Sequence, residues 1–193
     1  EPASENLAKL DKNVGLNEFK NVVIIPKAVS SACGWTKLYI SADDSGGNAF
    51  WDPAEWWENK KSQEKGTVCE SVEVTTIDSE LSYREIKVSL IKIDVEGAEE
   101  YVLRGALNGL HICRPVVIAE FSPFALQQLG SSEQTLRGLM AANGYHTFLP
   151  YRSGDLPKLI PPTTSIRFPH NVNLLFSTIE EVGKMWDEAQ SKC

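Results

Sequence analysis

Long hydrophobic runs are missing from this 193-residue sequence. No apolar stretch approaches the roughly 20 residues that span a bilayer, and the N-terminal residues form no signal-peptide core. Asn-x-Ser/Thr glycosylation sites are absent as well. We therefore predict a soluble protein with no membrane partner.

Cysteine is scarce, and its spacing is uninformative. The four cysteines, Cys33, Cys69, Cys113 and Cys193, lie far apart and include no C-x-x-C pair. This pattern indicates neither a zinc site nor a disulfide scaffold. We expect reduced thiols and a cytoplasmic location.

Positive charge is also in short supply. The net charge is −7 and the pI is about 5.1, so no basic face would bind a phosphate backbone, and we predict no nucleic-acid partner. The hydrophobic share of 42% and the charged share of 23% are typical of a globular protein. The length predicts a single domain, residues 1–193, with a substantial core. The oligomeric state is not predicted.

The stretch Ser89–Leu110 is the most informative part of the chain. A short apolar strand, Leu90–Ile93, is followed by the polar residues Asp94–Glu96 and then by a helical pattern with one apolar face. This is the pattern of a βα unit in a parallel sheet. Because ligands gather at the carboxyl ends of such strands, we expect Asp94 and Glu96 at a binding site.

The remaining chain continues the alternation of helices and strands. We expect helices over Glu5–Asn13, over Asp78–Glu85 with Asp78 as the N-cap, after the cap Ser131–Glu133, and from Ser177 onward. We expect strands over Val22–Ile25, Lys37–Ser41, Ser71–Thr76, Pro115–Phe121, Tyr145–Leu149 and Asn171–Phe176. Residues 42–71 and 150–169 are expected to be irregular. The alternation predicts a doubly wound α/β sheet.

Each acid in the central unit has a structural interpretation beside the functional one. Asp94 is either a catalytic carboxylate or the N-cap of the next helix, and Glu96 either lines a pocket or complements the helix dipole. Gly97 allows a tight turn or a close approach to a ligand. Glu99 and Glu100 are expected to be solvated helix acids.

Glu120 ends an otherwise apolar strand, where a carboxylate is costly unless it is paired or lies at the mouth of a site. Together with Asp94 and Glu96 it offers the hard oxygen ligands that magnesium or calcium prefers. Because sequence spacing alone fixes no geometry, we predict no metal.

Other polar and aromatic residues leave their roles open. His111, His146 and His170 are scattered, and His170 is either a base that reaches the same mouth or a solvated loop residue. The loop residues Asp43, Asp44 and Asn48 are candidates for ligand contact. The aromatic cluster Phe50, Trp51, Trp56 and Trp57 indicates either a binding surface or packing against the core.

The segment IKIDVEGAEEYVLRGA, followed by RPVVIAE, resembles the FkbM family of S-adenosylmethionine-dependent methyltransferases. The residues that carry the resemblance are Lys92, Asp94, Glu96, Gly97, Glu99, Leu103, Arg104, Gly105, Ala106 and Glu120. Weaker matches occur at Glu1-Pro2, Thr76–Asp78 and Asn173–Phe176. The resemblance covers most of the chain and is weakest over 42–71 and 150–169.

The resemblance implies a Rossmann-like class I methyltransferase sheet with helices on both faces, and S-adenosylmethionine as the cofactor. By position, Glu1 would bind the ribose hydroxyls, Asp78 would lie near the adenine, and Asp94 would contact the cofactor as well as act in catalysis. Glu96 and Glu120 would complete the catalytic site. The implied reaction is O-methylation of a hydroxyl on a small molecule or a sugar.

The family's first strand and the glycine-rich turn after it have no counterpart in the sequence. We expect an N-terminally incomplete domain that binds the cofactor poorly alone and is inactive by itself. The alternative is a non-catalytic binding or interaction module that retains the methyltransferase fold. A sugar-nucleotide-binding transferase would share the architecture, but no motif here supports one.

Overall fold

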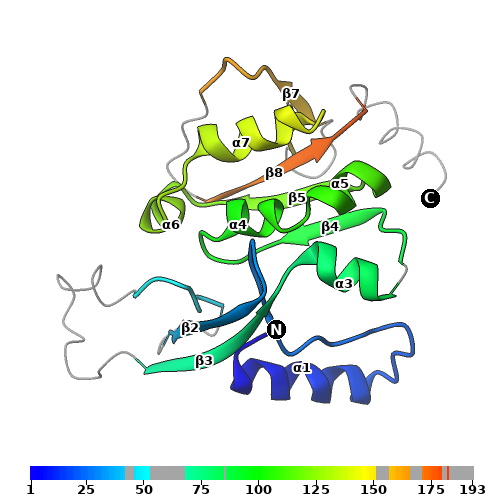
Figure 1. The fold of residues 1–193 in the computed structure, drawn as a ribbon, viewed down its shortest axis with the longest axis vertical. Helices are drawn as coiled ribbons and strands as arrows, with labels where there is room; N and C mark the ends of the chain where they lie inside the picture. The colour runs from blue at the N-terminus through cyan, green and yellow to red at the C-terminus, as the bar shows by residue number, and fades with distance from the viewer. Residues whose placement is uncertain are drawn as a thin grey trace.

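A computed structural model describes residues 1–41, 46–52, 68–84, 86–150, 157–165, 171–179 and 182. Helices and strands alternate, and the sheets are flanked by helices, which confirms the predicted α/β class (Figure 1). The helices are α1 (Ser4–Leu16), α3 (Ile77–Arg84), α4 (Glu99–Arg104), α5 (Leu107–Cys113), α6 (Pro123–Gln128) and α7 (Glu133–Ala142). The strands are β1 (Ala28–Val29), β2 (Gly34–Ile40), β3 (Val68–Thr75), β4 (Leu90–Ile93), β5 (Val116–Phe121), β6 (His146–Leu149), β7 (Lys158–Ile160) and β8 (Val172–Ser177).

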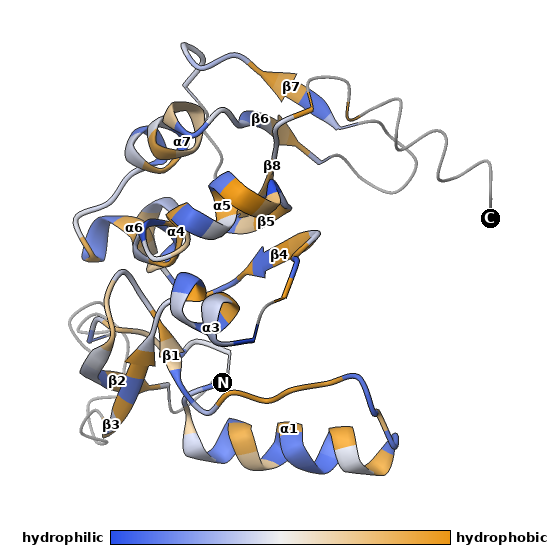
Figure 2. Cartoon of the chain, turned by 45° about the vertical axis from the view of Figure 1, so that its right-hand side comes forward, coloured by the Kyte–Doolittle hydropathy of each residue, from blue (hydrophilic) through white to orange (hydrophobic). Residues whose placement is uncertain are grey.

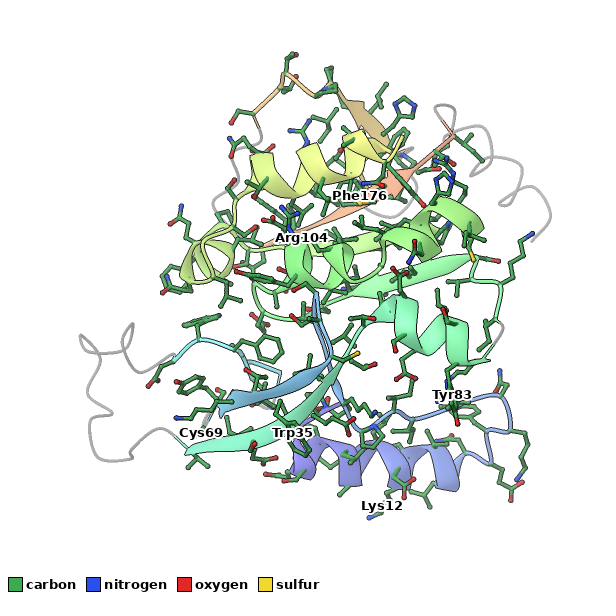
Figure 3. The ribbon with its side chains drawn as sticks, viewed as in Figure 1. Lys12, Trp35, Cys69, Tyr83, Arg104 and Phe176 are labelled. Carbon is green, nitrogen blue, oxygen red and sulfur yellow. The ribbon has the colours of Figure 1, made fainter. Side chains whose placement is uncertain are left out.

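The larger sheet has five strands in the order β4-β5-β8-β6-β7. β4 and β5 are parallel, and the other pairs in this sheet are antiparallel. Alternate residues of the strands point to one face, where they pack with α4, α5, α6 and α7 in the main core. Phe176 of β8, labelled in Figure 3, belongs to this core and is fully buried. Burial of this face holds the upper part of the molecule together.

The opposite face of the larger sheet carries a smaller apolar cluster of Phe148, Leu175 and Val182. β8 therefore buries residues on both faces, which explains its nearly continuous apolar sequence. Val182 belongs to the predicted C-terminal helix, and the rest of that helix after Ile179 lies outside the described residues.

The smaller sheet has three strands in the order β1-β3-β2 and lies with α1 in the lower part of the molecule (Figure 1). Its core consists of Ala3, Ala28, Leu38, Val72 and Val74. The first turn of α1 is tied to β3, because the backbone N–H and hydroxyl of Ser4 both donate to the Glu70 carboxylate, at 3.0 and 2.8 Å. The first of these bonds satisfies a backbone N–H that the start of a helix leaves unpaired.

The expected single sheet is thus divided into two, and the expected strand Val22–Ile25 is not one. The segment is an extended coil between α1 and β1, visible as an orange stretch in Figure 2, and Val23 is 65% exposed. The strand forms instead at Ala28–Val29, beside β3. An apolar run becomes a strand only where a neighbouring backbone pairs with it, and no described strand lies beside Val22–Ile25.

The helix expected to run through to Leu110 is broken into α4 and α5 at Gly105 and Ala106. A Cβ added at Gly105 would lie 2.1 Å from the Ser30 carbonyl oxygen, so only glycine fits this approach between the two parts of the fold. The Gly105 carbonyl accepts from the Asp78 N–H at 2.9 Å, outside the helix. A tertiary contact therefore ends a helix that its periodicity would continue.

Sequence reasoning missed two short elements, α6 and β7. α6 has the Ser122 hydroxyl as its N-cap and Pro123 at its first position, a start signal that could have been recognised. β7 lies in the proline-rich stretch that was expected to be irregular, and pairs with β6. The predicted cap of α7 is confirmed, since Ser132 and Thr135 form a reciprocal capping box.

Candidate functional site

A cavity of about 800 Å³ lies between the two parts of the fold. Its walls come from α1 and the residues before it, from β1, from the loop after β2, and from the ends of β4 and β5. Polar lining residues are Glu1, Asn6, Lys9, Asn13, Lys27, Asn48, Asp94, Glu96 and Glu120. This volume falls in the range of about 300–1,000 Å³ typical of small-molecule and cofactor sites.

Asp94 and Glu120 reach this cavity because they lie at the carboxyl ends of two parallel strands. β4 and β5 pair in register from Leu90 opposite Val116 to Ile93 opposite Ala119, so the next residues, Asp94 and Glu120, emerge side by side. The carboxyl ends of parallel strands meet at one edge of a sheet, as the sequence led us to expect. Carboxylate oxygens of Asp94, Glu96 and Glu120 lie within 4.8 Å of one another. We call these three residues the carboxylate cluster.

Partial burial and the neighbouring acids raise the pKa of Glu120 above its ordinary value. Desolvation contributes most, followed by a hydrogen bond to Asp94 and the negative charges of Asp94 and Glu96. A hydrogen bond from Asn171 at 3.5 Å opposes the shift. Glu120 therefore holds a proton more readily than an ordinary glutamate does.

Lys92 adds a positive charge beside the cluster that sequence reasoning did not assign to the site. Its Nζ lies 2.9 Å from Asp94 Oδ2, and both side chains are about half exposed, at 45% and 56%. Lys92 and Asp94 are two positions apart in the chain, so both side chains point to the same side of the strand. An exposed ion pair of this kind contributes little to the stability of the protein. The contact with Lys92 instead orients the Asp94 carboxylate.

Between β4 and α4, the chain makes a turn with an unusual backbone. Glu96 has φ +50° and Gly97 has φ +101°. Asp94 does not cap the following helix, which begins at Glu99 after Ala98 and has no side-chain cap. Glu96 likewise lies before the helix rather than in its first turn. The structural alternatives considered for both acids are therefore wrong.

Two side chains hold this turn by its backbone. The Trp51 indole N–H donates to the Glu96 carbonyl at 2.9 Å. Glu99 Oε1 accepts from the N–H groups of Val95 and Gly97, both at 3.3 Å. Trp51 belongs to the aromatic cluster for which the sequence left two interpretations open, a binding surface or packing against the core. Glu99 was expected to be a solvated helix acid.

The expectation for Glu99 and Glu100 is wrong, since they are 1% and 9% exposed. Burial raises the pKa of Glu99, and its backbone hydrogen bonds only partly offset this. For Glu100, burial also acts to raise the pKa, but hydrogen bonds from Ser131, Arg104 and Thr135 outweigh it and hold the pKa below its ordinary value. α4, on which Arg104 is labelled in Figure 3, packs against α7, so its acids face protein rather than water.

Glu1 lines the cavity, and its side chain is exposed. One carboxylate oxygen, Oε1, accepts from the Ala3 N–H at 2.9 Å, at the start of α1. This contact orients the side chain while it remains at the cavity. Its expected role toward ribose stays a prediction.

Asp78 lies away from the cavity lining. Its two carboxylate oxygens accept from the N–H groups of Asn108 and Gly109, at 3.0 and 2.8 Å, in the first turn of α5. Asp78 lies inside α3, so it is not the N-cap of its own helix, where the Thr76 hydroxyl accepts from the Ser79 N–H. Asp78 caps a different helix from the one expected.

Other candidate residues fall in several places. Asn48 and Phe50 line the cavity, and Asn48 Oδ1 also accepts from the Ser41 N–H at 3.0 Å. His111 and His146 are exposed and do not line it. Asp43, Asp44, Trp56, Trp57 and His170 lie outside the described residues. The cysteines Cys33, Cys69 and Cys113 are free thiols, as expected.

The carboxylate cluster has the spacing that could hold a metal ion. Exposed acidic groups often gather without one, and within the described part of the chain nothing else indicates a cation. The three carboxylates can also accept hydrogen bonds and protons from a ligand. None of the described helices is long and apolar enough to cross a membrane.

These features define a class: a mixed α/β protein with sheets flanked by helices and an acidic cavity where two parallel strands end. The family model of the methyltransferase FkbM domain matches residues 1–147. The chain therefore belongs to the FkbM methyltransferase domain family. This membership confirms the resemblance drawn from the segment around Asp94, and it does not favour the non-catalytic alternative.

A solved structure supports the fold. The chain is similar to the crystal structure of methyltransferase FkbM from Methylobacillus flagellatus KT, determined at 2.20 Å resolution, with a TM-score of 0.50 and 15% sequence identity. The similarity covers 91% of this chain and 35% of that one, so the chain spans about a third of that protein's length. A search of curated proteins gives no match.

Proposed function

We propose that the chain is part of an S-adenosylmethionine-dependent methyltransferase that methylates a hydroxyl group of a small molecule or a sugar. Family membership supports methyl transfer as the reaction. The observation that carries the proposal is the carboxylate cluster, which opens onto the same cavity that Glu1 lines.

The chemistry of the lining suits the cofactor. Ribose hydroxyls need acceptors, and Glu1 offers a carboxylate at the cavity. The negative charges of Asp94, Glu96 and Glu120 favour a cationic ligand in the same space. S-adenosylmethionine, when bound, supplies a methyl group on a positively charged sulfur.

The residues of the chain would act on the acceptor. Asp94 accepts a hydrogen bond from the acceptor hydroxyl, which aims its oxygen for an in-line displacement. The bound cofactor would supply the methyl group to this oxygen, and the Asp94 carboxylate would take the proton that the acceptor hydroxyl loses. Glu120 lies beside Asp94 and takes up a proton readily because its pKa is raised. Glu96 adds negative charge at the same mouth.

The test separates the two roles by substitution in the full-length protein. Glu1→Gln should weaken binding of S-adenosylmethionine, measured by calorimetry, by roughly tenfold, since a charge-assisted hydrogen bond contributes about 1.5 kcal/mol or more. Asp94→Asn should leave this affinity nearly normal, because the Glu96 and Glu120 carboxylates remain in the cavity. It should lower turnover by about 10²-fold or more, measured as S-adenosylhomocysteine release with a panel of sugars and small alcohols.

Glu18→Gln is a matched control, because Glu18 is an exposed acid shortly after α1 that does not line the cavity. It should change neither quantity. Unchanged turnover in Asp94→Asn would contradict its catalytic role. A full-length protein that neither binds S-adenosylmethionine nor releases S-adenosylhomocysteine would support the non-catalytic alternative instead.

A further inference from the structure

We propose that Glu99 and Trp51 are positioning residues of the site, which hold the turn Asp94–Gly97 by its backbone and thereby direct the Glu96 carboxylate toward Asp94 and Glu120. The importance of this arrangement for catalysis rests on the proposed function. The positioning itself can be tested without cofactor or acceptor.

The turn needs such support because its backbone is unfavourable. A residue other than glycine in the left-handed region costs about 1–2 kcal/mol, and Glu96 has φ +50°. Inside the turn, one backbone hydrogen bond, from the Ala98 N–H to the Val95 carbonyl, is long at 3.3 Å. A conformation of this kind persists only where surrounding contacts determine it.

Glu99 supplies the first of these contacts, although burying its carboxyl group costs free energy. The residue is 1% exposed, and one of its oxygens, Oε1, accepts from both Val95 and Gly97. The other oxygen, Oε2, is buried without a hydrogen-bond partner among the described residues. A carboxyl group buried this way is expensive, so its value lies in bridging two N–H groups of the turn.

Trp51 supplies the second contact from a different part of the chain. Its indole N–H donates to the Glu96 carbonyl, and its ring packs at nearly a right angle to the Phe124 ring on α6, at a centroid distance of 5.6 Å. Gly97 also packs against α6, since a Cβ at this position would lie 2.4 Å from the Ala125 carbonyl oxygen. Trp51 and α6 therefore enclose the turn together.

The position of the Glu96 carboxylate can be read from the titration of Glu120, because Glu96 is one of the charges that raise the pKa of Glu120. The experiment measures this pKa by carbon-13 NMR of the labelled carboxyl groups, with Glu120→Gln to assign the signal. Glu96→Gln sets the reference, since it removes the Glu96 charge outright and should lower the pKa of Glu120.

Trp51→Phe should reproduce most of the reference shift, because it removes the hydrogen bond but keeps an aromatic ring. Glu99→Ala should do the same, because it removes both backbone contacts. Glu99→Gln retains an oxygen acceptor, so it should restore most of the high pKa and separate hydrogen bonding from any direct charge effect of Glu99.

Two substitutions serve as matched controls, one of a neighbouring acid on α4 and one of another tryptophan. Glu100→Gln changes the next buried acid of α4, which contacts Arg104 and Ser131 rather than the turn. Trp35→Phe changes a tryptophan that is 72% exposed on β2 in the smaller sheet (Figure 3). Both should leave the pKa of Glu120 as in the wild type.

A folded Glu99→Ala or Trp51→Phe protein with an unchanged Glu120 titration would overturn the proposal for that residue. If Glu99→Ala does not fold, the Glu99 contact is decided by Glu99→Gln: a full reference shift in that variant would mean that charge, not positioning, is at work. Since the titration uses no cofactor, failure of methyl transfer leaves these outcomes unaffected.

Discussion

Two adjacent residues, Glu96 and Gly97, place the candidate site by adopting backbone angles that most side chains disfavour. Both have positive φ, and Gly97 also lies against the backbone of α6. The turn therefore reverses the chain in a few residues and leaves the Glu96 side chain at the cavity. The sequence left two interpretations of Gly97 open, a tight turn or a close approach to a ligand. In the structure Gly97 lies in the turn, and its close approach is to the backbone of α6.

Gly97→Ala should destabilise the protein strongly, because it combines an unfavourable φ of +101° with a clash at 2.4 Å from the Ala125 oxygen. We expect a loss of about 2–5 kcal/mol in the free energy of unfolding, from backbone strain and overpacking together. Chemical denaturation measures it. Gly130→Ala is the control, since Gly130 has φ +71° and open space around it, and should lose only about 1 kcal/mol. Equal losses would show that the contact with α6 contributes nothing.

On the scale of single elements, α4 is a short helix with two neighbouring buried acids in opposite electrostatic states. The pKa of Glu99 is raised, so the folded protein binds this proton more tightly than the unfolded chain does. Its contribution to stability is fully present below the ordinary pKa of about 4.3 and is lost as the pH rises through the raised value. The pKa of Glu100 is lowered, so its contribution is present above the ordinary pKa and is lost as the pH falls.

This contrast predicts opposite pH dependence for two matched substitutions. Relative to the wild type, Glu99→Gln should gain stability as the pH rises from about 4 to about 7, because an amide carries no ionisation cost. Glu100→Gln should lose about 1–2 kcal/mol at about pH 7 and less at about pH 4, because the hydrogen bonds to its charge weaken. Thermal melts at both pH values give the comparison. The same pH trend in both variants would contradict the assignment of Glu99 as the acid with the raised pKa.

On the scale of the whole molecule, the cavity lies where the two sheets meet, and the junction of α3 with α5 joins them. Asp78 donates its N–H to Gly105 and accepts two N–H groups at the start of α5. The backbone of Gly105 in turn approaches Ser30 of the smaller sheet's part of the chain. This junction contributes to the stability of the contact between the two parts of the fold.

Asp78→Ala should therefore act on stability rather than on the ligand. Loss of a helix cap costs about 0.5–2 kcal/mol, and we expect a decrease in that range in chemical denaturation. Affinity for S-adenosylmethionine should stay as in the wild type, since Asp78 does not line the cavity. Asp11→Ala, an exposed substitution on α1, should change neither. A loss of affinity with unchanged stability would instead support the cofactor role expected from the family resemblance.

Much of the local structure was readable from the sequence because local signals specify it. The strand Leu90–Ile93 was predicted with its observed bounds, and the cap at Ser132 follows from side-chain chemistry within four residues. The position of Asp94 and Glu120 at neighbouring strand ends follows from the βα pattern and the parallel pairing it predicts. Periodicity and capping act over one element, so one sequence suffices to read them.

The tertiary structure alone decided what depends on partners far away in the chain. Among the described strands, none lies beside the apolar run Val22–Ile25, and the contact of Gly105 with Ser30 divides a helix that is continuous by periodicity. Glu99 looked like a surface acid until the fold placed it beneath the turn that it holds. Burial, strand pairing and backbone approach are set by packing between distant segments, and a pattern along one stretch of sequence does not contain them.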